Sequence, residues 1–250
     1  MIYSKIFDFC AVRNKGSYHK NVDGVPRRVI FLINLLKELN LSYEIDKFPD
    51  PKNSQIPLFN ILLKGQGKHW FVAHHDIYNP ESENANDNSC SVINLIALKL
   101  LRPEINVCLT DGEEFGGLGA QRLSDQILSG KIEADWILNL ELTGIGGKNF
   151  FIGNYPGLLS DKIIKLFDPP IMFRLPFNDA VIFQRNGIDT CVINPLPLLE
   201  RGTSDLQKKT GEYLDLRILY RCHQLSDSCD KISIDDMKEF VEEVLVPIAK

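Results

Sequence analysis

The sequence predicts an α/β fold: a three-layer sandwich with a central mixed, mostly parallel sheet and helices on both faces. The first observation is that short apolar segments alternate along the chain with segments of helical periodicity, which is typical of parallel strands covered by helices. The second is size and composition, because 250 residues with 44% hydrophobic side chains suit one α/β domain. We therefore expect a single domain over residues 1–250, since no linker, internal repeat or low-complexity tract interrupts the pattern.

The first helix is expected at residues 26–40. Pro26 suits the first turn of a helix, because its ring fixes φ near the helical value. Val29, Ile33 and Leu36 follow near helical spacing and would form one apolar face. Three extended segments come next, at residues 42–48, 58–65 and 69–75.

The rest of the chain continues this alternation. Further helices are expected at residues 89–101, 116–129, 158–167, 179–185 and 234–249. Further strands are expected at residues 105–110, 136–142, 150–152 and 190–194. Residues 195–211 follow neither pattern, and a loop of more than about 12 residues in a compact domain is often functional. This segment is either a lid over a site or a surface loop, and the sequence leaves both open.

Composition excludes several classes of protein. There are 28 Lys and Arg residues against 33 Asp and Glu, a net charge of -5, which argues against nucleic acid as a partner. No apolar run approaches the roughly 18 to 20 residues that cross a bilayer, and the first residues, MIYSKIFDFC, lack the features of a secretory signal. The six cysteines form no C-x-x-C pair and are expected to be free thiols. We expect a cytoplasmic protein that binds neither membranes nor nucleic acid.

Acids and histidines follow the predicted apolar strands. In open α/β sheets, ligands bind beyond the carboxyl ends of the strands, so these side chains are candidates for a common site. They are His74, His75 and Asp76 after one strand, Asp111, Glu113 and Glu114 after another, Glu141 after a third, Asp87 before a helix, and His223 late in the chain.

Each of these residues alone has an ordinary structural explanation. Asp87, between two asparagines, would cap a helix, and His223 would lie on the surface. Glu141 at the end of a very apolar strand is harder to explain, because Glu is almost never buried without a partner. The hypothesis of a site therefore depends on the residues occurring together.

The charges of the four acids Asp87, Glu113, Glu114 and Glu141 point to metal ions. Four carboxylates in one crevice would repel one another unless cations compensated them. Two divalent ions would do so, and a mixed carboxylate and imidazole set suits Zn²⁺ better than Mg²⁺. A dinuclear site can also activate water for hydrolysis. One carboxylate must then stay free of the metals to accept the proton of that water.

The motifs and their order resemble a known family. Residues 72–232 contain, in this order, AHHD, ANDN, DGEEFGGLGA, LNLELTG and CHQLSDSCDKI. This series resembles the co-catalytic zinc aminopeptidases of the aminopeptidase Y and bacterial leucyl aminopeptidase type. The resemblance implies a zinc-exopeptidase, or phosphorylase-like, fold. It also implies that the dimerisation domain of related two-domain enzymes is missing, because residues 142–178 are too few to hold one.

The resemblance assigns a role to each site residue. It implies five zinc ligands: Asp87 bridging two ions, His74 and Glu141 at one ion, and Glu114 and His223 at the other. Glu113 would be the general base, and Asp76 would orient the imidazole of His74. Asp227 would support His223. His75 occupies the variable position of its motif and is the weaker candidate.

Three positions depart from the family pattern. Glu141 stands where the family usually has Asp, which could weaken one metal site, so two Zn²⁺ per chain are expected and one is possible. Ala180 stands where the family often has His, and Asp189 replaces a Pro, both on the expected substrate side. Specificity therefore stays open. Five apolar candidates for a side-chain pocket are Phe115, Tyr155, Phe183, Leu198 and Tyr220.

Three functions remain after the sequence analysis. The leading one is a zinc-dependent aminopeptidase that hydrolyses the N-terminal residue of peptides, with a peptide or small amide as substrate. The second is a glutaminyl-cyclase-like acyltransferase with a single zinc; those enzymes tend to carry Trp just before the last histidine, where this chain has Cys222. The third is a non-catalytic binding module that keeps the fold. The sequence does not indicate the oligomeric state.

Overall fold

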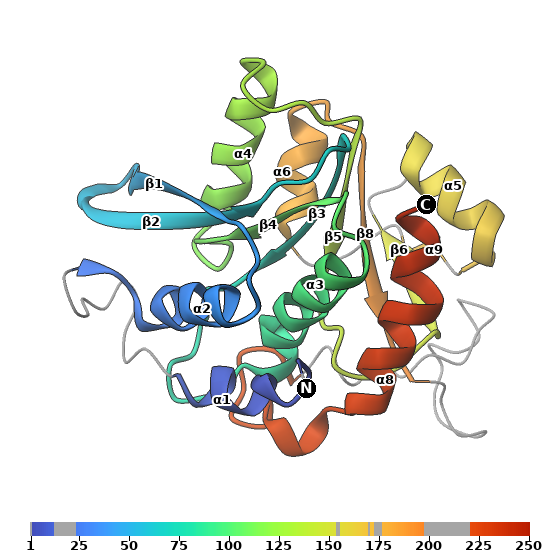
Figure 1. Ribbon diagram of the computed structural model, residues 1–250, viewed down its shortest axis with the longest axis horizontal. Coiled ribbons are helices and arrows are strands. Elements are labelled where there is room, and N and C mark those ends of the chain that lie inside the picture. Colours follow the sequence, from blue (N-terminus) through green and yellow to red (C-terminus); the bar gives the residue numbers. More distant parts are fainter. Residues whose placement is uncertain (1, 13–23, 154–155, 170, 173–176, 198–220) are drawn as a thin grey trace.

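The computed structural model describes residues 2–12, 24–153, 156–169, 171–172, 177–197 and 221–250. One mixed sheet runs through this part of the chain, with strand order β1-β2-β4-β3-β5-β8-β6-β7 (Figure 1). Its strands are β1 (Glu44–Asp50), β2 (Asn53–Leu63), β3 (His69–His74), β4 (Asn106–Thr110), β5 (Trp136–Leu140), β6 (Phe150–Gly153), β7 (Ile171–Met172) and β8 (Thr190–Pro195).

The centre of the sheet is parallel and its flanks are largely antiparallel. The parallel pairs are β3 with β4, β3 with β5, β5 with β8, and β6 with β7. The antiparallel pairs are β1 with β2, β2 with β4, and β6 with β8. This arrangement confirms the mixed sheet expected from the sequence. It also brings the carboxyl ends of β4, β3, β5 and β8 to one edge.

Helices cover both faces of the sheet (Figure 1). They are α1 (Lys5–Ala11), α2 (Arg27–Glu38), α3 (Cys90–Leu101), α4 (Leu118–Leu128), α5 (Leu158–Phe167), α6 (Asp179–Arg185), α8 (Ile234–Glu239) and α9 (Val246–Ile248), with the short helical segments η2 (Ala85–Ser89), η4 (Cys229–Lys231) and η5 (Phe240–Leu245). The three-layer expectation is confirmed.

The buried apolar side chains form two clusters, one on each face of the sheet. The larger joins residues of α1, α2, α3, α5 and the C-terminal helices, and the smaller joins residues of α4 and α6. Along β5, Ile137 belongs to the smaller cluster and its neighbour Leu138 to the larger one. Successive residues of a strand point to opposite faces. The central strands are therefore apolar throughout because both of their faces are buried.

Most predicted elements are found within a few residues of their expected bounds. Helices α5 and α6 begin and end at the predicted residues. The C-terminal helix is continuous from Ile234 to Ile248, with wider turns over η5. The sequence analysis missed α1, the short strand β7 and the first residues of β2, which lie in the exposed part of the β1–β2 hairpin.

Arg28 in α2 connects this helix to the segment after β3 and to the turn before α3. Its side chain is fully buried, its Nε donates to the carbonyl oxygen of His75 at 2.7 Å, and its Nη2 donates to Oγ of Ser89 at 2.8 Å. His75 follows β3, and Ser89 ends the turn before α3. The sequence analysis did not single out Arg28, because only the folded chain brings these acceptors to it.

Three further expectations can be compared with the described residues. All six cysteines are free thiols, as expected. No helix in the described part of the chain is long and apolar enough to cross a membrane. Most of the 195–211 segment lies outside the described residues, as does part of the chain on either side of β7. The expectations of a lid and of a single domain over residues 1–250 therefore stay predictions.

Candidate metal centre

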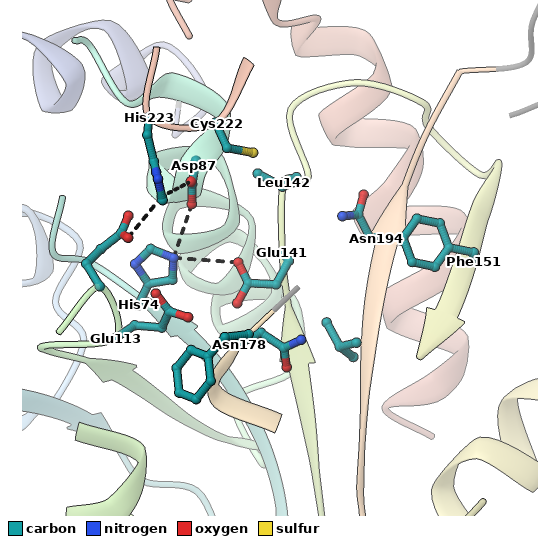
Figure 2. A pocket seen from close by; sticks show the side chains of 13 residues that line it. His74, Asp87, Glu113, Glu141, Leu142, Phe151, Asn178, Asn194, Cys222 and His223 are labelled. Atoms are coloured by element: carbon teal, nitrogen blue, oxygen red, sulfur yellow. Dashed lines mark ion pairs between the residues drawn. The ribbon is translucent and has the colours of Figure 1, made fainter. Parts of the chain in front are cut away.

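The acids and histidines predicted to form a site meet at the carboxyl edge of the parallel strands (Figure 2). His74 is the last residue of β3, Glu113 and Glu114 follow β4, and Glu141 directly follows β5. Two further residues come from segments outside the strands: Asp87 lies in the η2 turn before α3, and His223 lies shortly before η4. The convergence that the sequence analysis assumed is present in the structure.

Asp87 lies between the two histidines. Nε2 of His74 is 3.3 Å from Oδ1 of Asp87 and 3.5 Å from Oε2 of Glu141. Nε2 of His223 is 3.4 Å from Oδ2 of Asp87 and 3.0 Å from Oε2 of Glu114. Each oxygen of the Asp87 carboxylate thus faces a different imidazole, as a carboxylate that bridges two cations would require.

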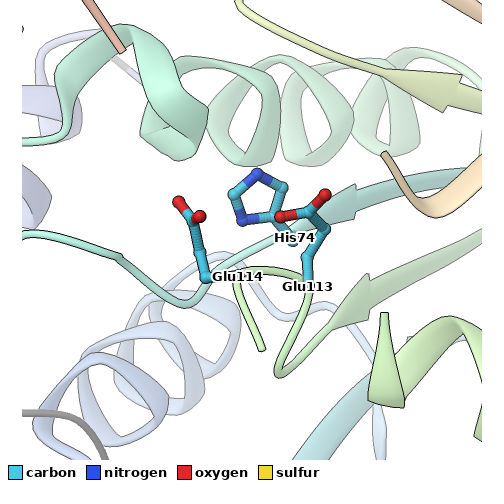
Figure 3. A group of neighbouring side chains, drawn as sticks. All are labelled: His74, Glu113 and Glu114. Carbon is cyan, nitrogen blue, oxygen red and sulfur yellow. The ribbon is translucent and has the colours of Figure 1, made fainter. Parts of the chain in front are cut away.

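Three groups of side chains in this cluster could each hold a metal ion. In every group the candidate ligand atoms lie within 4.8 Å of one another. The first two groups share Asp87: His74, Asp87 and Glu141 form one, and Asp87, Glu114 and His223 form the other. In the third, Glu113 and Glu114 lie on either side of the His74 ring (Figure 3).

The donor set fits zinc. Carboxylate oxygens and imidazole nitrogens are ordinary Zn²⁺ ligands. Oε1 of Glu114 is buried without a hydrogen-bond partner among the described residues, so an acceptor at the site is left for a cation. Protein groups alone do not satisfy this cluster.

Protons compensate the cluster when no metal is bound. The hydrogen bonds to Asp87 and Glu114 raise the pKa of His223 to about 10. Burial alone would lower the pKa of His74, but Glu141 and the neighbouring aspartates raise it well above its usual value. Burial also raises the pKa values of Glu113, Glu114 and Glu141. The imidazoles therefore act as the cations of the metal-free site.

The model of the family described as Peptidase family M28 matches residues 63–246, which is most of the chain. The chain belongs to peptidase family M28. The resemblance inferred from the motifs is therefore confirmed, and the matched range contains the whole metal cluster.

Solved structures of similar fold include aminopeptidases and glutaminyl cyclases. The Legionella pneumophila LapA aminopeptidase superposes with a TM-score of 0.70 at 13% identity, over 99% of this chain and 69% of that one. A Porphyromonas gingivalis glutaminyl cyclase gives 0.68 at 16% identity, over 99% of this chain and 96% of that one. The Bacillus subtilis zinc aminopeptidase BSAP gives 0.56 at 18% identity, over 77% and 49%. At these identities the likeness establishes the fold. A comparison with curated proteins found no match.

Asp76 contacts both His74 and the turn that carries Glu113 and Glu114. Its Oδ1 lies 3.3 Å from Nδ1 of His74, the ring nitrogen that faces away from Asp87. The same carboxylate accepts the backbone N–H groups of Glu113 at 3.2 Å and of Glu114 at 3.1 Å. The resemblance implied only the contact with His74. The structure adds that Asp76 also holds the turn that carries both glutamates.

Two asparagines hold Glu141, and the sequence analysis missed both roles. Nδ2 of Asn88 donates to Oε2 of Glu141 at 2.9 Å, and Nδ2 of Asn139 donates to Oε1 at 2.9 Å. Asn139 and Glu141 are two residues apart on an extended segment, so their side chains point to the same face. That spacing was the available signal for Asn139. These donors explain how a Glu at the end of an apolar strand is tolerated.

Several other residues lie outside the cluster or beside it. His75 points away, with Nε2 2.9 Å from the carbonyl oxygen of Phe59, and burial lowers its pKa to about 4.

Asp179, which the sequence analysis did not assign, is buried and accepts a hydrogen bond from Oγ1 of Thr110 at 2.6 Å; burial raises its pKa to about 7. The ring of Tyr78 stacks on His223 with centroids 4.3 Å apart.

A cavity of about 400 Å³ adjoins the cluster, a volume in the range of small-molecule sites. Its apolar lining comes from Leu142, Phe151, Phe177 and Val192. Of the apolar candidates proposed from the sequence, Phe183 packs in the smaller core cluster instead. Phe115 is not among the described lining residues, and Tyr155, Leu198 and Tyr220 lie outside the described residues.

Proposed function

We propose that the chain is a zinc-dependent aminopeptidase that hydrolyses the N-terminal residue of peptides or small amides. The observation that carries this proposal is the pair of ligand groups that share Asp87, with Glu113 beside them at one end of a cavity. The proposal assigns His74 and Glu141 to one ion, Glu114 and His223 to the other, and Asp87 to both. Two Zn²⁺ per chain follow from it.

When bound, Zn²⁺ would act as a Lewis acid: it would polarise the scissile carbonyl and lower the pKa of water, so that water can lose a proton and attack near neutral pH. Asp76 fixes the orientation of His74 and of the turn after β4. The Asn88 and Asn139 amides hold the carboxylate of Glu141 in place. These contacts preorganise the ligand set.

Glu113 is the general base in this proposal. Its carboxylate lines the cavity and belongs to neither of the two groups that share Asp87. It accepts the proton of the attacking water and delivers a proton to the amine that leaves. The backbone bond to Asp76 keeps Glu113 at this place in the turn.

The charge of the cavity favours an amino terminus in the substrate. The described lining residues include four carboxylates, Asp87, Glu113, Glu114 and Glu141, and no Lys or Arg. Two Zn²⁺ would offset these four charges, so the loaded site does not repel an amine, whereas a terminal carboxylate finds no Lys or Arg clamp among these residues. This supports removal of N-terminal rather than C-terminal residues.

A glutaminyl-cyclase-like reaction with one zinc is the second candidate. One observation favours it: the fold superposes on 96% of the Porphyromonas gingivalis glutaminyl cyclase but on only 69% of the LapA aminopeptidase. Cys222 lines the cavity just before His223, at the position where the cyclases tend to have Trp. The non-catalytic binding module is less favoured, because the ligand set and Glu113 are all present at the cavity.

Metal counting and product analysis separate these functions. Purified protein is stripped of metal, reloaded with excess Zn²⁺, desalted, and its zinc content is measured. We expect close to two Zn²⁺ per chain and release of free amino acid from aminoacyl-nitroanilides, with activity lost on chelation. One Zn²⁺ per chain with a pyroglutamyl product would support the cyclase, and zinc binding without turnover would support the binding module.

We also propose a cytoplasmic location. All six cysteines are free thiols, and reducing compartments keep thiols in that state. Fractionation of cells that produce the untagged chain, with antibody detection, tests this location. Recovery of the protein from the medium would contradict it.

A further inference from the structure

We propose that Tyr78 is a positioning residue of the metal centre: its ring holds the imidazole of His223 in the orientation that binds one of the two ions. This role rests on the proposed function, because it takes His223 as a zinc ligand. It goes beyond that function, because neither the sequence motifs nor the similar proteins assign a role to Tyr78.

The two histidines of the centre are held in different ways. The side chain of His74 is 1% exposed, and Oδ1 of Asp76 lies 3.3 Å from its Nδ1. The side chain of His223 is 40% exposed, and its Nδ1 has no carboxylate partner in the described part of the chain. Asp227 holds the backbone of Asp87 instead. A metal-binding imidazole is normally oriented by a partner on its other side, so another group must orient His223.

Tyr78 is placed to do so. Its ring stacks on the imidazole of His223 with centroids 4.3 Å apart and planes 24° from parallel. Aromatic rings favour such stacked contacts, so rotation of the imidazole away from Tyr78 is unfavourable. In this orientation Nε2 of His223 lies 3.0 Å from Oε2 of Glu114 and 3.4 Å from Oδ2 of Asp87 (Figure 2). The stack therefore orients the nitrogen that faces the two carboxylates.

The residue after Tyr78 fixes the backbone of His223. Nδ2 of Asn79 donates to the carbonyl oxygen of His223 at 3.1 Å. The φ of His223 is 64°, in the left-handed region that residues with a Cβ rarely adopt. Such a conformation persists only where contacts from elsewhere hold it. Tyr78 and Asn79 thus act on the ring and on the backbone of the same residue.

Further hydrogen bonds join the two segments that carry these rings. Oγ of Ser82 donates to the carbonyl oxygen of Gln224 at 2.8 Å, and Oε2 of Glu83 accepts the backbone N–H of Cys229 at 2.6 Å. None of these bonds involves the side chain of Tyr78. Loss of the Tyr78 ring should therefore free the imidazole without releasing the segment behind it.

Tyr78 acts through His223 rather than on a substrate or on the core. It is 56% exposed, and it is not among the described residues that line the cavity, whereas His223 is. Substitution of so exposed a side chain should have little effect on the stability of the metal-free chain. An effect on zinc without an effect on folding is therefore the signature of a positioning role.

The variants Tyr78→Leu and Tyr78→Phe test this role in the full chain. Leu removes the stacked ring, and Phe keeps the ring without its hydroxyl. Zinc is titrated into the metal-free protein in competition with a chelating dye, which gives an affinity for each ion. We expect Tyr78→Leu to lower the affinity for one ion by at least about tenfold and to leave the other unchanged. Tyr78→Phe should bind zinc like the wild type.

The background His223→Ala shows whether Tyr78 acts through His223. In that background Tyr78→Leu should change the affinity for the remaining ion by less than about twofold, because the imidazole that Tyr78 holds is absent. The control Phe7→Leu, at an aromatic residue of α1 that is 49% exposed, should bind zinc like the wild type. Urea unfolding of the metal-free chain should agree between the wild type and Tyr78→Leu.

The outcomes separate this role from the proposed function. Unchanged zinc affinity in Tyr78→Leu overturns the role of Tyr78, and with two ions and turnover retained it leaves the aminopeptidase standing. One zinc per wild-type chain, held at least about tenfold more weakly in Tyr78→Leu, supports the role of Tyr78 and overturns the two-zinc aminopeptidase. An equal loss in Tyr78→Phe, a full loss in the His223→Ala background or a destabilised metal-free chain overturns positioning by the ring.

Discussion

The carboxylate of Asp227 accepts the backbone N–H of Asp87 at 3.0 Å, so a residue from the end of the chain holds the proposed bridging ligand. Its other oxygen accepts the N–H of Asn86 at 2.7 Å. The sequence analysis expected Asp227 to support His223. The structure instead places it under the η2 turn, where it fixes the backbone of Asp87.

The substitution Asp227→Asn tests this arrangement. It replaces one of the two acceptor oxygens by a donor, so one backbone N–H of the turn loses its partner. We expect zinc affinity to fall by about 10- to 100-fold while the chain stays folded. Competition with a chelating dye measures the affinity, and circular dichroism checks the fold. Asp230→Asn, at a nearby exposed residue, should bind zinc like the wild type.

Zinc binding should release protons near neutral pH. His223 has a pKa raised to about 10 by Asp87 and Glu114, and the pKa of His74 is also raised. Both imidazoles are thus protonated in the metal-free site at pH 7.5 and must lose their protons to bind a metal. Calorimetric titration in buffers of different ionisation enthalpy measures the number released. At least two protons per chain are expected, and none would contradict the proposed ligand set.

The buried His75 should make stability depend on pH. Burial lowers its pKa to about 4 in the folded chain, against about 6.5 when unfolded. Between these values the unfolded state binds the extra proton, so stability is full above about pH 6.5 and is lost as pH falls toward 4. From pH 7 to pH 5 this contributes about 2 kcal/mol to the loss of unfolding free energy. Urea unfolding of the metal-free protein measures it.

The variant His75→Gln is the comparison for that measurement. Gln can still donate to the carbonyl oxygen of Phe59 but does not titrate in this range. Its unfolding free energy should therefore fall by about 2 kcal/mol less between pH 7 and pH 5. Parallel pH curves for the two proteins would show that His75 is not the group responsible.

Removal of the Arg28 guanidinium should destabilise the fold. Arg28→Met leaves the carbonyl oxygen of His75 and Oγ of Ser89 without their buried donor. We expect a loss of about 2–4 kcal/mol in unfolding free energy, measured by urea denaturation. The matched change Arg27→Met, at the exposed neighbouring residue, should cost less than about 0.5 kcal/mol. Equal effects of the two variants would contradict the role of Arg28.

The sequence predicted the central elements well because their signals are local. Helix α5 and helix α6 have short, clear periodic patterns, and the parallel strands are apolar on both faces. The first helix α1 was missed, since only seven residues form it and tertiary contacts of Phe9 and Cys10 stabilise it. Such contacts are not visible in a local pattern.

The sequence predicted the proposed metal ligands of the site, but not the residues that hold those ligands in place. Charged residues after apolar strands are conspicuous in a sequence, which is why His74 and Glu141 stood out. The roles of Asn88 and Asn139 depend on which segments become neighbours in the folded chain. Neutral amides carry no such signal of their own, so only the folded chain shows which of them face the cavity.

The kcat of Glu113→Gln tests the central claim most directly. Gln keeps the size of the side chain and cannot accept the proton of the attacking water. With zinc content equal to that of the wild type, kcat for an aminoacyl-nitroanilide should fall by about 10²- to 10⁴-fold. A fully zinc-loaded Glu113→Gln enzyme with wild-type kcat would contradict the proposed mechanism.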